Sequence, residues 1–134
     1  MRITPAIESD ADYILERDKH IAKDLVMPKI QQNEILVIRK EEERIGWLRH
    51  GYFWDHIPFL NMIWIDEPYR GQGIGTEAVL HWETFMNRKG FRQVMTSTMS
   101  NEESQHFYRK LGYKDAGCLL LENEPLEIIL TKKI

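Results

Sequence analysis

Residues 66–76 read Asp66-Glu67-Pro68-Tyr69-Arg70-Gly71-Gln72-Gly73-Ile74-Gly75-Thr76, and here an apolar run ends and a helical pattern begins. The preceding run, Phe59 to Ile65, is nearly all apolar and predicts a strand covered on both faces. After the glycines, apolar residues at helical spacing predict a helix that ends near Gly90: Ile74, Ala78, Val79, Trp82, Phe85 and Met86. The segment therefore joins a strand to a helix through a glycine turn.

Outward from this junction, the chain alternates short strand and helix patterns. Strands are predicted at residues 2–4, 35–38, 45–48, 91–98, 113–121 and 126–131. Helices are predicted from an N-cap at Ser9 or Asp10, from about Lys19 until just before Pro28, and over residues 102–111. Residues 51–58 form an unusually aromatic connection. This order predicts an α/β or α+β fold in a single domain, residues 1–134.

Composition excludes several classes of protein. A net charge of -3 over 134 residues gives no electrostatic reason to expect a nucleic-acid partner, and no apolar stretch is long enough to cross a membrane. The five histidines show no compact metal-ligand spacing, so no metal is expected. The single cysteine, Cys118, is expected to be a small buried residue. The N-terminus lacks a signal-peptide pattern, which predicts a cytoplasmic location.

The glycine turn has the chemistry of an anion site. Glycine admits positive φ and close approach of a ligand to the main chain, and Gly71, Gly73 and Gly75 are expected to provide both on alternate residues. Arg70 adds positive charge, and the helix that follows directs its N-terminal N–H groups and its dipole at the same point. The spacing is neither the dinucleotide-binding pattern nor that of a P-loop. A phosphate-containing ligand is therefore expected here.

A second motif follows about thirty residues later and reads Asn101-Glu102-Glu103-Ser104-Gln105-His106-Phe107-Tyr108-Arg109-Lys110-Leu111-Gly112-Tyr113. Together with Arg70-Gly71-Gln72-Gly73-Ile74-Gly75, this segment resembles the two signatures of the GNAT superfamily of acyl-CoA-dependent N-acyltransferases. The resemblance covers essentially the whole chain and is strongest from Phe59 to Tyr113. It implies a central mixed, mostly antiparallel twisted sheet of six to seven strands with about four helices.

The resemblance also implies binding roles for acetyl-CoA, the co-substrate. The main chain of Arg70, Gly71, Gln72, Gly73, Ile74, Gly75 and Thr76 would hold the pyrophosphate. Backbone groups of Ile63, Trp64 and Ile65 would pair with the pantetheine arm and supply the oxyanion donor. Asn101 would contact the pantetheine from the opposite side.

Tyr108 occupies the position where the family commonly has a tyrosine general acid. A phenol there would give a proton or a hydrogen bond to the departing CoA thiolate. On helical spacing alone, Phe107, Tyr108 and Leu111 would instead be the core face of a helix. The motif context favours the catalytic role.

The acceptor side and the general base are less well defined. Many relatives carry Glu or His on the strand before the glycine turn, whereas Phe59 to Ile65 has Asn61 as its only polar residue. Asp66, Asp55, His56, His50 and a chain of waters are the alternatives for removing the proton of the amine. Tyr52, Trp54, Asp55 and Asn61 are candidates for binding an amine with an apolar body. A hydrophobic loop over the core or a dimer contact would explain the same aromatic segment.

Three hypotheses follow. The first is an enzyme that moves an acetyl group from acetyl-CoA to a primary amine of a small molecule, peptide or protein by direct attack in a ternary complex. The second is a CoA-binding regulatory or interaction module with weak or no catalysis, which the missing base on the strand supports. The third is an α/β domain whose glycine turn is accidental. The partners expected are an amine acceptor and, as in many relatives, a second copy of the chain in a homodimer.

Overall fold

The computed structural model describes all residues from Met1 to Ile134, and its contacts divide the chain into two compact units. The first unit comprises Met1–His50 and Met62–Trp82, and the second comprises Gly51–Asn61 and Glu83–Ile134. Three continuous elements belong in part to each unit: β3 (Glu43–Phe53), β4 (Ile57–Ile65) and α3 (Ile74–Arg88). The backbone passes from one unit to the other within regular structure.

The first unit packs two short helices against a meander of strands. It contains β1 (Arg2–Pro5), α1 (Ala11–Arg17), α2 (Val26–Gln31) and β2 (Ile35–Lys40). β2 pairs antiparallel with β1 on one side and with β3 on the other. Ile14, Val37 and Trp47 have no exposed surface and form the centre of the core. Alternate residues of the strands thus meet the apolar face of α1.

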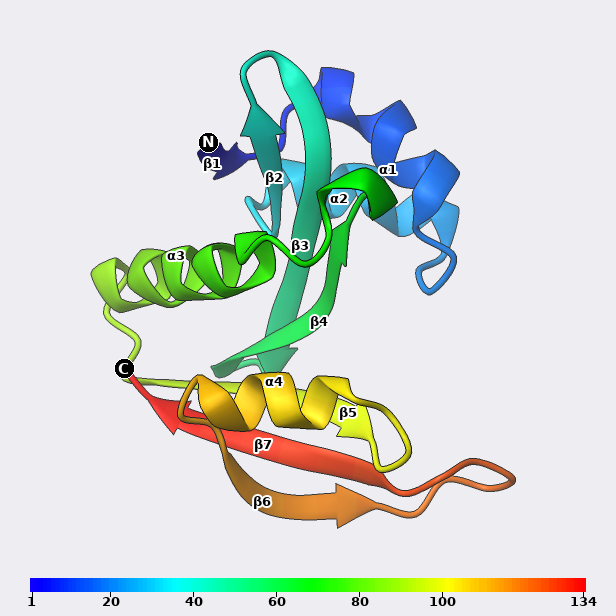
Figure 1. The fold of residues 1–134 in the computed structure, drawn as a ribbon, viewed down its shortest axis with the longest axis vertical. Coiled ribbons are helices and arrows are strands. Elements are labelled where there is room, and N and C mark those ends of the chain that lie inside the picture. The colour runs from blue at the N-terminus through cyan, green and yellow to red at the C-terminus, as the bar shows by residue number, and fades with distance from the viewer. The chain divides into compact units, whose positions relative to one another are not determined.

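The second unit places one helix beside three strands. It contains β5 (Gln93–Met99), α4 (Ser104–Lys110), β6 (Lys114–Leu119) and β7 (Glu127–Lys133). Figure 1 shows α4 beside β5 and β7, with β6 along the far side of β7. β7 pairs antiparallel with both β5 and β6, whereas Phe59 and Leu60 of β4 pair parallel with Met95 and Thr96.

The seven strands form one hydrogen-bonded sheet in the order β1-β2-β3-β4-β5-β7-β6. A mixed, largely antiparallel sheet with four α-helices confirms the predicted fold class. None of these helices combines the length and the apolarity that a membrane span requires.

The second predicted helix has different bounds from those expected. Residues 19–25 contain only a short 3-10 turn, and α2 begins at Val26 with Pro28 in its first turn. Proline is tolerated there because the first N–H groups of a helix have no intrahelical acceptor. Asp10 is the N-cap residue of α1, as predicted, but its side chain makes no capping hydrogen bond. Its buried carboxylate accepts from the Ile7 N–H and pairs with Arg39 and Arg44.

The aromatic segment 51–58 is not a connection. β3 continues to Phe53 and β4 starts at Ile57, so only three residues form the turn. The predicted burial of both faces of the 59–65 strand is wrong as well, because Asn61 is exposed and residues 62–65 are only partly buried. Cys118 is exposed on β6, whose two faces are both open, and is not the buried residue expected.

Candidate functional site

The glycine turn lies in the first unit, where it links β4 to α3. Gly71 and Gly73 have φ angles of 75° and 81°, a region in which only glycine is unstrained. Gly75 differs from the prediction, because α3 has already begun at Ile74 and Gly75 belongs to its first turn. The first α3 hydrogen bond to Gly73 comes from Glu77, so the N–H groups of residues 74–76 have no acceptor within the helix. These donors are the ones an anion would meet.

The long side chains of the turn fold back onto the protein. Arg70 Nε donates to the Ile65 carbonyl at 2.7 Å, and its guanidinium lies 4.6 Å from the centre of the Trp64 ring. Gln72 Nε2 donates to the Pro68 carbonyl at 3.3 Å. Arg70 nevertheless stays exposed and keeps its charge beside the turn. The sequence-predicted phosphate residues 70–76 are therefore contiguous and accessible.

Asp66 anchors the end of β4. Its carboxylate accepts hydrogen bonds from Tyr13 Oη at 3.0 Å, from Arg17 Nε at 3.2 Å and from Trp64 Nε1 at 2.9 Å. Desolvation and this carboxylate raise the pKa of Tyr13. These three donors tie the carboxylate to α1 and to Trp64, which is the arrangement of a structural anchor and not of a group that is free to meet an amine. The structure thus favours a positioning role for Asp66.

Trp64, on the strand expected to meet the pantetheine, makes two ring contacts. Its ring stacks on Trp47 with centroids 5.8 Å apart, and the Arg70 guanidinium lies near the same ring. Gly46 of β3 permits close approach of β4, since a Cβ at that position would collide with the Trp64 carbonyl oxygen. Ile63, Trp64 and Ile65 are all partly buried. Sequence reasoning did not single out Gly46.

Tyr108 lies in the second unit, on α4, with only 5% of its surface exposed. Its ring packs edge-on against Phe107 and Tyr113. Burial raises the pKa of Tyr108 to about 12, although a side-chain hydrogen bond with Thr96 acts to lower it. Thr96 donates its hydroxyl proton to the Leu60 carbonyl at 2.9 Å. Tyr108 is therefore both a core residue and a protonated phenol.

Thr98 of β5 and Asn101 of the turn that follows β5 are two further candidate site residues of the second unit. The Thr98 hydroxyl is buried and has no hydrogen-bond partner, and it lies on the same face of β5 as Thr96. Asn101 is exposed in the turn between β5 and α4. Sequence reasoning identified Asn101 but missed Thr96 and Thr98, although alternate threonines directly before the second motif were a usable signal.

A cavity of about 350 Å³ opens on the other face of the same strands. Tyr52 and Asn61, two of the four predicted acceptor residues, line it. Sequence reasoning missed the remaining lining residues: Phe53, Phe59, Ser97, Leu119 and Ile129. Trp54 and Asp55 do not line the cavity and form the exposed tip of the β3–β4 turn.

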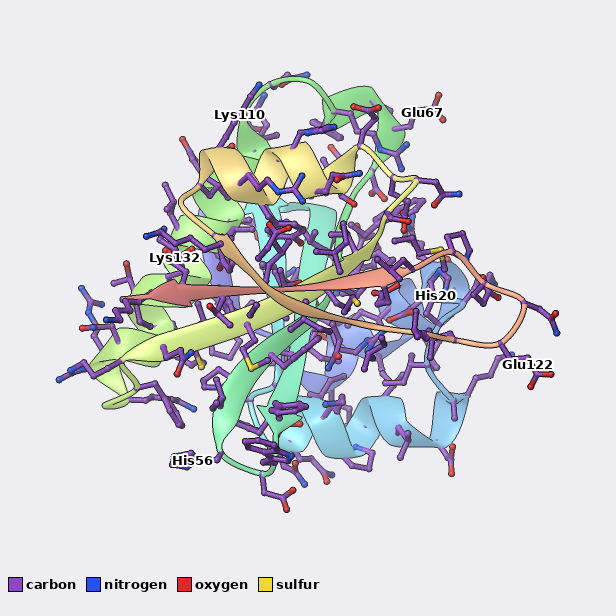
Figure 2. All side chains as sticks on the ribbon, turned by 90° about the horizontal axis from the view of Figure 1, so that it is seen from below. His20, His56, Glu67, Lys110, Glu122 and Lys132 are labelled. Atoms are coloured by element: carbon purple, nitrogen blue, oxygen red, sulfur yellow. The ribbon has the colours of Figure 1, made fainter.

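The alternative base candidates lie elsewhere. His56 points outward from the β3–β4 turn (Figure 2), where Asp55 is exposed too. His50 belongs to the first unit and is fully buried, with its ring 5.8 Å from that of Trp82. No group of three or more His, Cys, Asp or Glu side chains is arranged to hold a metal ion.

Comparisons with known proteins agree with this architecture. The profile of the Acetyltransferase (GNAT) family matches residues 4–113. A GNAT-family acetyltransferase from Bacillus cereus is similar in structure, with a TM-score of 0.79, 22% identity and coverage of 98% of this chain and 96% of that one. For the ribosomal-protein-alanine N-acetyltransferase from Brucella melitensis the TM-score is 0.80, at 16% identity over 100% of both chains.

An aminoglycoside 6'-N-acetyltransferase complexed with coenzyme A has a TM-score of 0.79 at 18% identity, covering 99% of this chain and 97% of that chain. A comparison with curated protein sequences gave no significant match. At these identities the solved structures show the fold, and the profile match, which spans most of the sequence, shows the family. The chain belongs to the GNAT family of acetyltransferases.

Proposed function

We propose that the protein transfers the acetyl group of acetyl-CoA to a primary amine by direct attack in a ternary complex. The observation that carries the proposal is the turn at Gly71 and Gly73, whose left-handed backbone leads into an α3 N-terminus with donors available at residues 74–76. A pyrophosphate suits this turn because it accepts several N–H groups at once and is stabilised by the helix dipole.

The residues present fit acetyl-CoA at two more points. The buried Thr98 hydroxyl has no partner in the protein, and an amide of the pantetheine arm would satisfy it. The backbone of Ile63 to Ile65 offers the hydrogen-bonding edge that an extended pantetheine would use, as in strand addition. Asn101 is a further proposed contact of the arm.

In the proposed reaction, acetyl-CoA supplies an activated thioester and the protein supplies positioning and charge stabilisation. The amine nitrogen forms a bond to the carbonyl carbon, and backbone N–H groups of residues 63–65 stabilise the negative charge that develops on the carbonyl oxygen. The carbon–sulfur bond then breaks, and the Tyr108 hydroxyl donates to the departing sulfur. The amine loses its proton to solvent, because no Asp, Glu, Lys, Arg or His side chain lines the cavity.

The lack of an acidic or basic side chain in the cavity wall also supports a second candidate function, a CoA-binding module without catalysis. One experiment separates the two. Thermal unfolding with and without saturating CoA tests the binding site, since a ligand that binds only the folded state raises Tm. Release of the CoA thiol from acetyl-CoA, measured across primary amines, then tests turnover.

A higher Tm with amine-dependent thiol release supports the acetyltransferase. A higher Tm with thiol release at the background rate for every amine supports the binding module. An unchanged Tm at saturating CoA rejects both functions. Gly90→Ala is a suitable control for the binding arm, since Gly90 has a positive φ at the end of α3, far along the helix from the turn.

A further inference from the structure

The cavity of the second unit is built from neutral side chains. Its walls are mostly apolar: the rings of Tyr52, Phe53 and Phe59, and the side chains of Leu119 and Ile129. Apart from the Tyr52 hydroxyl, the polar groups of the lining side chains come from Asn61 and Ser97. No Asp, Glu, Lys, Arg or His lines it. A charged group would lose part of its hydration there without gaining an oppositely charged partner, whereas an aliphatic or aromatic group gains free energy.

The cavity and Tyr108 are related through the same two strands. Successive residues of a strand point to opposite faces, so Asn61 and Ser97 face the cavity while Leu60 and Thr96 face away from it. Thr96 is hydrogen-bonded to both Tyr108 and the Leu60 carbonyl, and it pairs in register with Leu60. The cavity therefore opens directly behind the residues that hold the Tyr108 phenol.

The nearest carboxylate on the cavity face, judged by register, is Glu127. It pairs with Leu119 of β6 and Met99 of β5, one position beyond Ile129 on that face of β7. Glu127 does not line the cavity. The loop beyond it carries Glu122 at its outer end (Figure 2), directed away from the strands.

We propose that this cavity binds the apolar group of the acceptor, which is a primary amine attached to an uncharged aliphatic or aromatic body and not a polyamine or other polycation. This inference rests on the proposed acetyltransferase function and specifies its substrate class. The volume of about 350 Å³ accommodates one side group of moderate size.

Hexylamine and 1,6-diaminohexane test the inference, because they share the reacting amine and the chain length and differ in the charge at the far end. We expect kcat/KM for hexylamine to exceed that for the diamine about tenfold or more. The peptides Leu-Gly-Gly and Lys-Gly-Gly repeat the comparison with an N-terminal amine beside an uncharged or a charged side chain. Their rates, set against those of the two alkylamines, show whether the acceptor is a peptide N-terminus or a free amine.

Two neighbouring substitutions provide a matched pair. Leu119→Asp puts a carboxylate in the cavity wall at a side chain that is already 50% exposed, so folding should be retained. Leu120→Asp adds the same charge at an 85% exposed neighbour that does not line the cavity. Leu119→Asp should abolish or reverse the preference for hexylamine, and Leu120→Asp should leave it unchanged. Equal effects of the two variants, or a wild-type preference for the diamine, would overturn the inference.

Binding of the two amines to the CoA-loaded protein, measured by calorimetry, separates this inference from the proposed function. If no amine is acetylated, tighter binding of hexylamine that Leu119→Asp weakens and Leu120→Asp does not still supports the cavity assignment. Equal binding of both amines overturns it. If acetylation occurs without a preference, the acetyltransferase function stands and the substrate class proposed here is wrong.

Discussion

Tyr108 combines two properties that are usually separate, deep burial and proton donation. Its pKa of about 12 keeps the phenol protonated at every physiological pH. An ordinary thiol has a pKa of about 8.5, so complete proton transfer from this phenol to a thiolate is uphill. A hydrogen bond to the sulfur as negative charge develops there is the better description of the proposed role.

Tyr108→Phe keeps the ring and its packing between Phe107 and Tyr113 while it removes the donor. We expect kcat to fall by about tenfold or more, in the range typical of general acids, with the KM for acetyl-CoA nearly unchanged. Steady-state kinetics with the best amine of the panel measures both values.

Tyr113→Phe is the matched control for that experiment. It removes the bond from the Tyr113 hydroxyl to the buried Glu83 carboxylate, 2.9 Å away, and should lower Tm without lowering kcat. An unchanged kcat in Tyr108→Phe would remove Tyr108 from the mechanism.

Local sequence motifs predicted some residues of the site and missed others. Asn101 and Tyr108 belong to one continuous pattern, so their place in the β5–α4 region could be predicted from sequence. The partners of Asp66 could not, because Tyr13 and Arg17 lie 53 and 49 residues away and meet it only through packing of the first unit. Asp66 therefore had the sequence profile of a base, and the structure surrounds it with donors.

Among the elements, the turn before α3 is the most direct target for mutation. A Cβ at Gly73 would meet no atom within 4 Å, so the cost of Gly73→Ala is backbone strain at φ 81°, about 1–2 kcal/mol. Relief of that strain should redirect the N–H groups that bind the anion. We expect the increase in Tm caused by CoA to be reduced or lost, as measured by thermal unfolding.

Gly90→Ala serves as the control, since its φ of 101° is equally unfavourable for alanine and its surroundings are equally open. It should lower Tm of the free protein by a similar amount and retain the response to CoA. Loss of the response in both variants would show that stability, and not the turn, governs binding.

The β3–β4 turn is strained in a way that mutation can relieve. Trp54 and Asp55 both have positive φ, at 54° and 57°, although neither is glycine. The His56 N–H donates to the Phe53 carbonyl at 3.0 Å, so Trp54 and Asp55 are the two central residues of a β-turn. Asn-Gly is the preferred pair at two such positions, so Trp54→Asn with Asp55→Gly should stabilise the protein by about 1 kcal/mol. Denaturant unfolding measures the change, and a loss of stability would show that the exposed Trp54 ring makes a compensating contact.

Elements with a strong period were predictable, and elements set by tertiary pairing were not. The apolar stripe of α3 placed that helix correctly, with Ala78, Val79, Trp82 and Met86 all buried. Residues 19–25 carried the same spacing in a shorter window but contain only a 3-10 turn, and the helix of this region is α2, which begins at Val26. The continuation of β3 to Phe53 depends on its pairing with β4 and was not predicted from the sequence.

Across the whole molecule, three of the five tyrosines have pKa values raised chiefly by burial, and this sets the alkaline limit of stability. The pKa of a fourth, the surface residue Tyr69, is raised by its hydrogen bond to Glu43. Burial is the largest cause of the raised pKa values of Tyr13, Tyr108 and Tyr113, and hydrogen bonds to Asp66 and Glu83 add to the effect for Tyr13 and Tyr113. The folded state therefore holds these protons more tightly than the unfolded state does.

The sign of the pH dependence follows from the raised values. The contribution to stability is complete below the unfolded pKa of about 10 and is lost as pH rises through the folded pKa. Tyr108 has a pKa of about 12 in the folded state, so the stability lost through its ionisation between pH 10 and pH 12 is about 3 kcal/mol. That is a large share of a typical domain's stability. We expect cooperative unfolding in this interval, with three tyrosines ionising together in the absorbance of tyrosinate near 295 nm. Tyr108→Phe should remove one of the three and shift the transition to higher pH, whereas gradual, independent ionisation of all five tyrosines in a folded protein would contradict the burial of the three phenols.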